Sequence, residues 1–167
     1  DRGVLHLSSL RSLRVVDLSG TSISDVGAAA LGRTPQLGSL DISGTAVTDD
    51  GVRHLANCTE LTNLFLARTS IVGHGLRDLS ALRVVDLSHT ELDDTGMQDV
   101  ANLGQLERLG VAHTAVTDHG IQLLRRTDRL ERLRVTGTRV SDVGLGALTD
   151  LRWLQPTWAP GVGSTLT

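Results

Sequence analysis

The sequence is poor in aromatic residues and in cysteine. It contains one Phe, two Trp and no Tyr among 167 residues. A hydrophobic core must therefore be built from Leu, Val, Ile and Ala, which is feasible when short units stack the same aliphatic positions on one another. Cys58 is the only cysteine. A disulfide within the chain is thus excluded, and this favours an intracellular location without establishing it.

Lysine is also absent, and all 16 basic residues are arginines. The net charge of -3 and the isoelectric point of about 6.0 offer no general attraction to nucleic acid or to an acidic membrane surface. No stretch resembles a signal peptide or is long and apolar enough to span a membrane. The chain opens at Asp1 in the middle of a repeat, and we expect it to be a fragment of a longer protein.

One segment recurs along the whole chain. The first copy, LRVVDLSGTSISDVG, runs from Leu13 to Gly27, and full copies start at residues 13, 37, 61, 82, 106 and 130. The starts are 24 or 21 residues apart, a period typical of a solenoid. We expect a single domain over 1–167, with a partial repeat at 1–12 and a capping repeat at 151–167. In that capping repeat Pro156 and Pro160, together with Trp153 and Trp158, should cover the last open edge of the sheet.

Each unit predicts one short strand and one short helix. The alternation of Val16, Asp17 and Leu18 is typical of a strand with one buried face. Further on, apolar residues three positions apart, such as Val52 and Leu55, predict a helix packed along one stripe. Repetition of the two elements in one direction predicts an α/β solenoid, a curved horseshoe segment. It has a parallel β-sheet on the concave side and short helices on the convex side. In the 21-residue units we expect the helix side to be shorter.

Two polar patterns lie between strand and helix in most units. One threonine follows each strand, and we expect this row to satisfy backbone groups between repeats; its members are Thr21, Thr45, Thr69, Thr90, Thr114 and Thr138. Ser or Thr followed by Asp precedes four of the helices, at residues 24–25, 48–49, 117–118 and 141–142, with Asp93-Asp94 as a variant. These pairs predict helix capping rather than metal-binding loops.

The unit L-x-x-L-x-L-x-x-T-x-[IV]-[ST]-D-x-G-[VLI]-x-x-L resembles a leucine-rich repeat. The nearest subtype is the cysteine-containing class of F-box substrate receptors of ubiquitin ligases, because residues 47–58 carry V-T-D-D-G-V and then L-A-N-C. Here Thr stands where that class usually has Cys, the units are shorter, and no F-box segment is present. The resemblance implies a solenoid that recognises a protein partner.

Strand alternation identifies the side chains on the solvated, concave face of the sheet. The candidate protein-binding residues there are Asp17, Asp41, Phe65, Asp86, Arg108, Arg132 and Arg134, together with an outer row of Arg68, His89 and His113. Acidic residues gather at one end and basic residues at the other, which favours an elongated partner of opposite polarity. Phe65 would be an aromatic anchor. Asp17 and Asp41 are adjacent like charges, which a basic partner would explain. The alternative is that Asp17 and Asp86 are solvated copies inherited from one duplicated heptapeptide.

Other kinds of site find little support in the sequence. His89 and His113 lack a third ligand, so no metal site is predicted. No Ser-His-Asp arrangement, phosphate loop or nucleophilic cysteine is recognisable, so we expect no catalytic residue and no cofactor. Asn57-Cys58-Thr59 fits a glycosylation acceptor, which matters only in a secreted protein.

We therefore expect a non-enzymatic protein-interaction module or scaffold that is monomeric and binds neither nucleic acid nor membranes. One alternative is the substrate-recognition region of a ubiquitin-ligase receptor or of a secreted effector. The other is an extracellular adhesive or receptor module.

Overall fold

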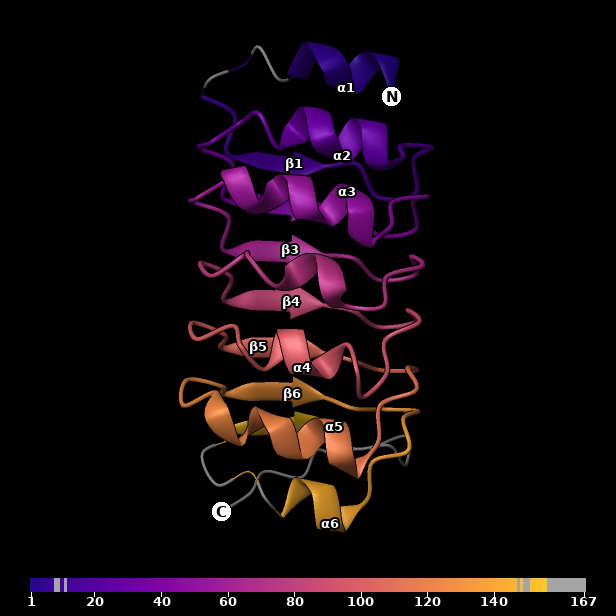
Figure 1. The fold of residues 1–167 in the computed structure, drawn as a ribbon, viewed down its shortest axis with the longest axis vertical. Coiled ribbons are helices and arrows are strands. Elements are labelled where there is room, and N and C mark those ends of the chain that lie inside the picture. Colours follow the sequence, from indigo (N-terminus) through magenta and orange to yellow (C-terminus); the bar gives the residue numbers. More distant parts are fainter. Residues whose placement is uncertain (8–9, 11, 147, 149–150, 156–167) are drawn as a thin grey trace.

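A single parallel sheet runs through the computed structural model, which describes residues 1–7, 10, 12–146, 148 and 151–155. Seven strands lie in it in chain order (Figure 1). They are β1 (Val15–Asp17), β2 (Ser39–Asp41), β3 (Asn63–Phe65), β4 (Val84–Asp86), β5 (Arg108–Gly110), β6 (Arg132–Arg134) and β7 (Trp153–Gln155). The predicted parallel sheet is therefore confirmed, including its seventh strand. Of the predicted cap, Trp153 lies on β7, whereas Pro156, Trp158 and Pro160 lie outside the described residues.

Neighbouring strands pair without any shift between repeats. Val16 aligns with Leu40, and Leu40 aligns in turn with Leu64. The middle residue of each of β1 to β6 is buried, while the residues on either side of it are half-buried or exposed. Each position of the repeat thus forms a row across the sheet. We call the side formed by the first and third strand residues the open face.

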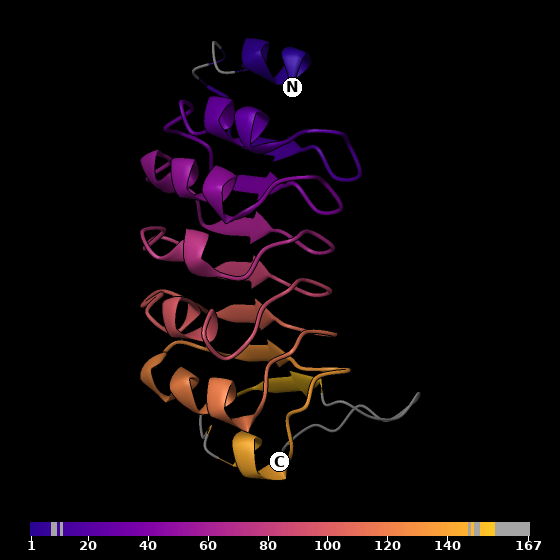
Figure 2. The ribbon, with the colours of Figure 1, turned by 45° about the vertical axis from the view of Figure 1, so that its right-hand side comes forward.

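Short helices form a second layer on the other side of the sheet (Figures 1 and 2). The α-helices are α1 (Arg2–Leu7), α2 (Asp25–Leu31), α3 (Asp49–Arg53), α4 (Met97–Val100), α5 (Asp118–Leu123) and α6 (Asp142–Leu145). Single 3-10 turns are η1 (His54–Asn57), η2 (His74–Leu76) and η3 (Leu124–Arg126). Of the two short units, the one that starts at residue 61 has only η2, so its helix side is trimmed as predicted. In the other, which starts at residue 130, part of the helix side (147 and 149–150) lies outside the described residues. None of the described helices has the length and apolar character needed to cross a bilayer.

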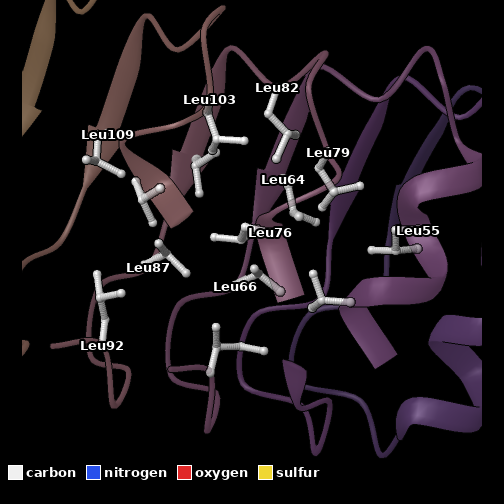
Figure 3. Packing of buried hydrophobic residues seen from close by; sticks show 14 of the residues in the cluster. Leu55, Leu64, Leu66, Leu76, Leu79, Leu82, Leu87, Leu92, Leu103 and Leu109 are labelled. Carbon is white, nitrogen blue, oxygen red and sulfur yellow. The ribbon is translucent and has the colours of Figure 1, made fainter. Parts of the chain in front are cut away.

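The core lies between the two layers and consists almost entirely of aliphatic side chains. Figure 3 shows leucines from successive repeats, among them Leu55, Leu76 and Leu87, gathered in this space. These three side chains have no exposed surface. Cys58 belongs to the same core, and burial raises the pKa of its thiol to about 11. A thiol that stays protonated and buried is a structural group, as expected for the only cysteine.

The threonine row forms hydrogen bonds within each repeat, and not between repeats. Thr90 Oγ1 donates to the Leu87 carbonyl oxygen at 2.6 Å. The same bond to the carbonyl three residues earlier is made by Thr21, Thr45, Thr69, Thr114 and Thr138. The predicted link between repeats was therefore wrong. The turn folds back so that the threonine hydroxyl meets the carbonyl of the first residue after the strand, within the same repeat.

Replacing Thr90 by valine should destabilise the protein by about 1–3 kcal/mol, because the buried Leu87 carbonyl loses its donor. Thr90 is 9% exposed, so water has little access to compensate. Urea unfolding measures the free-energy difference. Thr21→Val is the matched control, since Thr21 makes the same 2.6 Å bond in an exposed turn and should cost much less. Equal losses in the two variants would contradict the burial argument.

The Ser and Thr residues before the helices cap them as predicted. The side chains of Ser24, Thr48, Thr117 and Ser141 each accept a hydrogen bond from the backbone amide two residues later. In the variant unit Asp93 takes this role and accepts from the amides of Thr95 and Gly96. These bonds satisfy amides that have no partner inside a helix.

The aspartates that follow the capping residues join neighbouring repeats. Asp25 accepts from the Thr48 amide at 2.7 Å and from the Thr48 hydroxyl at 2.9 Å. The same pair of hydrogen bonds links Asp1 to Ser24, Asp94 to Thr117 and Asp118 to Ser141. Each carboxylate thus holds the capping residue of the next repeat, whereas the sequence pattern had suggested amides of its own helix.

Candidate functional site

The open face carries acidic residues toward the N-terminal end and basic residues toward the C-terminal end. In the third strand position, neighbouring strands place Asp17, Asp41, Phe65, Asp86, Gly110 and Arg134 in register. In the first position they place Val15, Ser39, Asn63, Val84, Arg108 and Arg132. The two rows predicted from strand alternation are confirmed as rows of neighbours. Whether these residues bind a partner stays a prediction.

The acidic residues of the open face have local hydrogen-bond partners. Asp17, Asp41 and Asp86 each accept from the amide of the serine two residues later, at 2.9 Å. The hydrogen bonds from the amide and then the hydroxyl of Ser19 hold the pKa of Asp17 below its usual value. Such bonds to a carboxylate close the turn after the strand. This local role explains the three aspartates without a basic partner, and it favours the interpretation in which Asp17 and Asp86 are copies from one duplicated heptapeptide.

Two arginines at the other end lack such partners. Arg108 and Arg132 are paired in register on β5 and β6, and both are exposed. Ion pairs do occur at the approaches to the strands, where Arg14 meets Glu60 and Arg83 meets Glu107. Among the described residues, no acidic side chain pairs with Arg108 or Arg132. Adjacent like charges without a counter-ion are unfavourable, so an acidic partner would stabilise this end of the face.

Phe65 is half-buried at the centre of the open face. It stands in register between Asp41 on β2 and Asp86 on β4. Part of the residue remains exposed between the two carboxylates. It is therefore a smaller apolar contact than the exposed aromatic that the sequence suggested.

The turns after β3, β4 and β5 share an unusual backbone conformation. Arg68, His89 and His113 have φ angles of 60°, 59° and 56°, and all three residues are exposed. We call these three residues the turn ridge. The equivalent positions in other repeats are Gly20, Gly44 and Gly137, with φ angles of 65°, 65° and 72°. A side chain in this left-handed region is uncommon, because its Cβ crowds the backbone.

The two histidines of the turn ridge stack on each other. Their ring centroids are 4.4 Å apart and the ring planes differ by 14°. In the next repeat a Cβ atom at Gly137 would overlap the His113 ring, so glycine there leaves room for the stack. Partial desolvation of the ring lowers the pKa of His89, and the charges of His113, Arg68 and Arg134 lower it further, while Asp86 opposes them. Near neutral pH this leaves an uncharged His89 beside arginines.

Arg68→Gly should stabilise the protein by about 0.5–1 kcal/mol, because glycine adopts a positive φ without crowding, which outweighs its greater freedom in the unfolded chain. Thermal or urea unfolding measures the gain. Arg108→Gly is the control, since its backbone is an ordinary strand and glycine should weaken it. A loss of stability in Arg68→Gly would mean that the arginine side chain supports the fold.

Metal binding finds no support in the arrangement of side chains. Within the described ranges, no group of three or more His, Cys, Asp or Glu side chains lies close enough to hold a metal ion. His89 and His113 have no third metal-binding side chain beside them among these residues. The turn ridge is therefore best described as the positive charge of Arg68 beside two imidazoles that can form hydrogen bonds.

Comparisons with known proteins agree with the repeat architecture. The Leucine Rich repeat family model matches residues 9–32, 37–56 and 79–101. No curated protein sequence matches the chain significantly.

Many solved structures resemble the fold, and three of them illustrate the likeness. An internalin from Listeria monocytogenes is 19% identical over 95% of this chain with a TM-score of 0.73, and the chain spans about half (51%) of that protein. Internalin C2 of the same bacterium is 20% identical over 89% of this chain, covering 73% of its own length, with a TM-score of 0.65. The plant peptide hormone receptor RGFR1 in complex with RGF2 is 15% identical over 90% of this chain and 29% of its own, with a TM-score of 0.59. At these identities the likeness shows the fold alone.

Proposed function

We propose that this leucine-rich-repeat solenoid is a non-enzymatic module that binds a protein partner through the open face of its sheet. The observation that carries the proposal is the pair of exposed, register-matched arginines, Arg108 and Arg132, for which the described residues supply no counter-ion. Arginine is enriched among residues that dominate protein interfaces. The basic end of the open face is accordingly the principal contact region.

The charge distribution indicates the polarity of the partner. The aspartates at the N-terminal end are engaged with their own turns, whereas the basic end and the turn ridge add Arg108, Arg132 and Arg68 to the surface. A partner with an acidic patch would offset this charge and be oriented by it. Phe65 would contribute a central apolar contact.

The similar plant receptor supports a binding role of this general kind, because its structure is described as a complex with RGF2.

Cys58 favours a more specific candidate function. Its buried position matches the cysteine in the tail of the F-box receptor-like subtype. We therefore also propose, as a second candidate, the substrate-recognition region of a ubiquitin-ligase receptor or of a secreted effector. Asn57 is exposed, which keeps a glycosylated extracellular module as a third.

Affinity capture from cell lysate with quantitative mass spectrometry tests the proposed face. The wild-type chain is compared with Arg108→Glu/Arg132→Glu and with the control Arg125→Glu/Arg126→Glu, which makes the same charge change on η3 in the helix layer. We expect partners to be captured by wild type and control and lost from the open-face variant. Loss from the control variant alone would place binding on the helix layer and reject the proposal.

A further inference from the structure

We propose that the turn ridge of Arg68, His89 and His113 binds acidic side chains of the protein partner, more tightly as the pH falls. The stacked, exposed imidazoles and their left-handed backbone carry this inference. It rests on the proposed function, because it names the chemistry of the partner at one edge of the same face. The experiment that tests this inference distinguishes its failure from a failure of the proposed function.

The first argument is the backbone conformation. Three consecutive repeats place a bulky side chain at a position where three others have glycine with the same positive φ. Such a conformation is unfavourable for residues other than glycine and occurs often at binding sites. His113 stacks on His89 and needs Gly137 for room, but neither contact fixes the fold, since other repeats form the same turn with glycine. The side chains are thus dispensable for the turn and available for binding.

The second argument is the chemistry that the side chains offer. The Arg68 guanidinium is a planar donor suited to carboxylates. Each imidazole becomes a donor at both nitrogens when protonated. Stacked rings 4.4 Å apart repel each other when both are charged, and an anion placed against the pair relieves that repulsion. A carboxylate is therefore the group that complements the ridge.

Proton linkage gives the direction of the pH dependence. Four titratable or charged groups act on His89. They are His113 in the turn after β5, Arg68 in the turn after β3, Arg134 on β6 and Asp86 on β4, the strand that precedes His89. Among these groups only Asp86 favours its charged form, so the pKa of His89 in the free protein lies below its usual value. A bound carboxylate raises the pKa. Affinity must then rise as the pH falls from the bound-state pKa toward the free-state pKa, and level off below it.

A protein carboxylate fits the ridge better than nucleic acid does. Sites for single-stranded nucleic acid combine basic grooves with aromatic side chains on which bases stack. The two imidazoles of the ridge already stack on each other, and the chain as a whole carries a net charge of -3, which does not attract a long polyanion. An acidic peptide segment presents a few carboxylates to a local cluster of donors.

The test uses the 167-residue chain and a hexaglutamate peptide as the probe. The imidazole resonances of His89 and His113 are followed by NMR while peptide is added at pH values from about 7.5 to about 5.5, where Glu side chains remain largely ionised. We expect both resonances to shift on binding, and the dissociation constant to fall at least about fivefold over this range. Resonances that do not respond, or an affinity independent of pH, would overturn the inference.

The variant His89→Gly/His113→Gly restores the residue found at this position in other repeats, so it should fold. We expect it to bind hexaglutamate weakly and without pH dependence, while the control His119→Gln on helix α5 behaves as wild type. Unchanged binding in the double variant rejects the inference, as does tighter binding of a single-stranded thymidine hexamer than of hexaglutamate. In the lysate capture, partners kept by the double variant but lost from Arg108→Glu/Arg132→Glu reject this inference and leave the proposed function standing. Partners kept by both variants reject the proposed function itself.

Discussion

Asp49→Ala should destabilise the protein by about 3–5 kcal/mol, the largest loss expected from one polar side chain. Asp49 is 8% exposed and accepts three backbone hydrogen bonds from the next repeat, from the amides of Val72, Gly73 and Gly75 at 2.8, 3.1 and 2.6 Å. That repeat has no Ser or Thr at its helix start, so the carboxylate alone satisfies these amides. Each buried amide that loses its partner costs about 1–3 kcal/mol.

Asp118→Ala provides the comparison at the other end of the array. Asp118 joins the next repeat through the amide and hydroxyl of Ser141, but these bonds are exposed to solvent. Water can replace them, and the loss should be much smaller than that of Asp49→Ala. Urea unfolding of both variants measures the difference. If Asp49→Ala costs no more than Asp118→Ala, the carboxylate links do not hold the repeats together.

Gly96→Ala should destabilise the protein by at least about 3 kcal/mol, for a different reason. The repeat that starts at residue 61 has Gly73 where others have the joining aspartate, so its contact with the following repeat is made by backbone. A Cβ atom at Gly96 would overlap the carbonyl oxygen of Val72 and lie 2.9 Å from Leu92 Cδ1. Both repeats would have to move apart to admit one methyl group.

Gly104→Ala is the control for this substitution. Gly104 is exposed, and a Cβ atom there meets nothing within 4 Å, so the change should stay within about 0.5 kcal/mol. Thermal unfolding of the two variants gives the comparison. A stable Gly96→Ala protein would show that the repeats at this junction are not in tight backbone contact.

The sequence predicts the arrangement of the sheet because the repeats are all in phase. Positions one repeat apart, such as Asp17 and Asp41, become register partners without any further information. The helix starts were equally predictable, since a hydroxyl such as that of Thr48 accepts from a free amide of its own helix whatever the neighbouring repeat contributes. The hydrogen bonds between repeats could not be predicted from the sequence. A carboxylate such as Asp25 can satisfy either its own helix or the next capping residue, and only the stacking distance decides between them.

Two features of the candidate site could have been predicted from the sequence but were not. The alignment of Gly20 and Gly44 with His89 and His113 marks a left-handed position, which the φ angles confirm. The recurring Asp-x-Ser at the strand ends marks the turn that engages Asp17. Neither feature follows from hydrophobic periodicity, because both depend on turn geometry. The stacking of the two imidazoles required the structure, since side-chain rotation determines it.

Site-specific photo-crosslinking tests the central claim, binding through the open face, most directly. A benzoylphenylalanine is placed at Asn63, in the middle of the open face on β3, or at Gln98, exposed on α4 in the helix layer. Each protein is irradiated in lysate, and covalent adducts are identified by mass spectrometry. The account predicts a discrete protein adduct from position 63 and none from position 98. An adduct from position 98, with none from position 63, would contradict it.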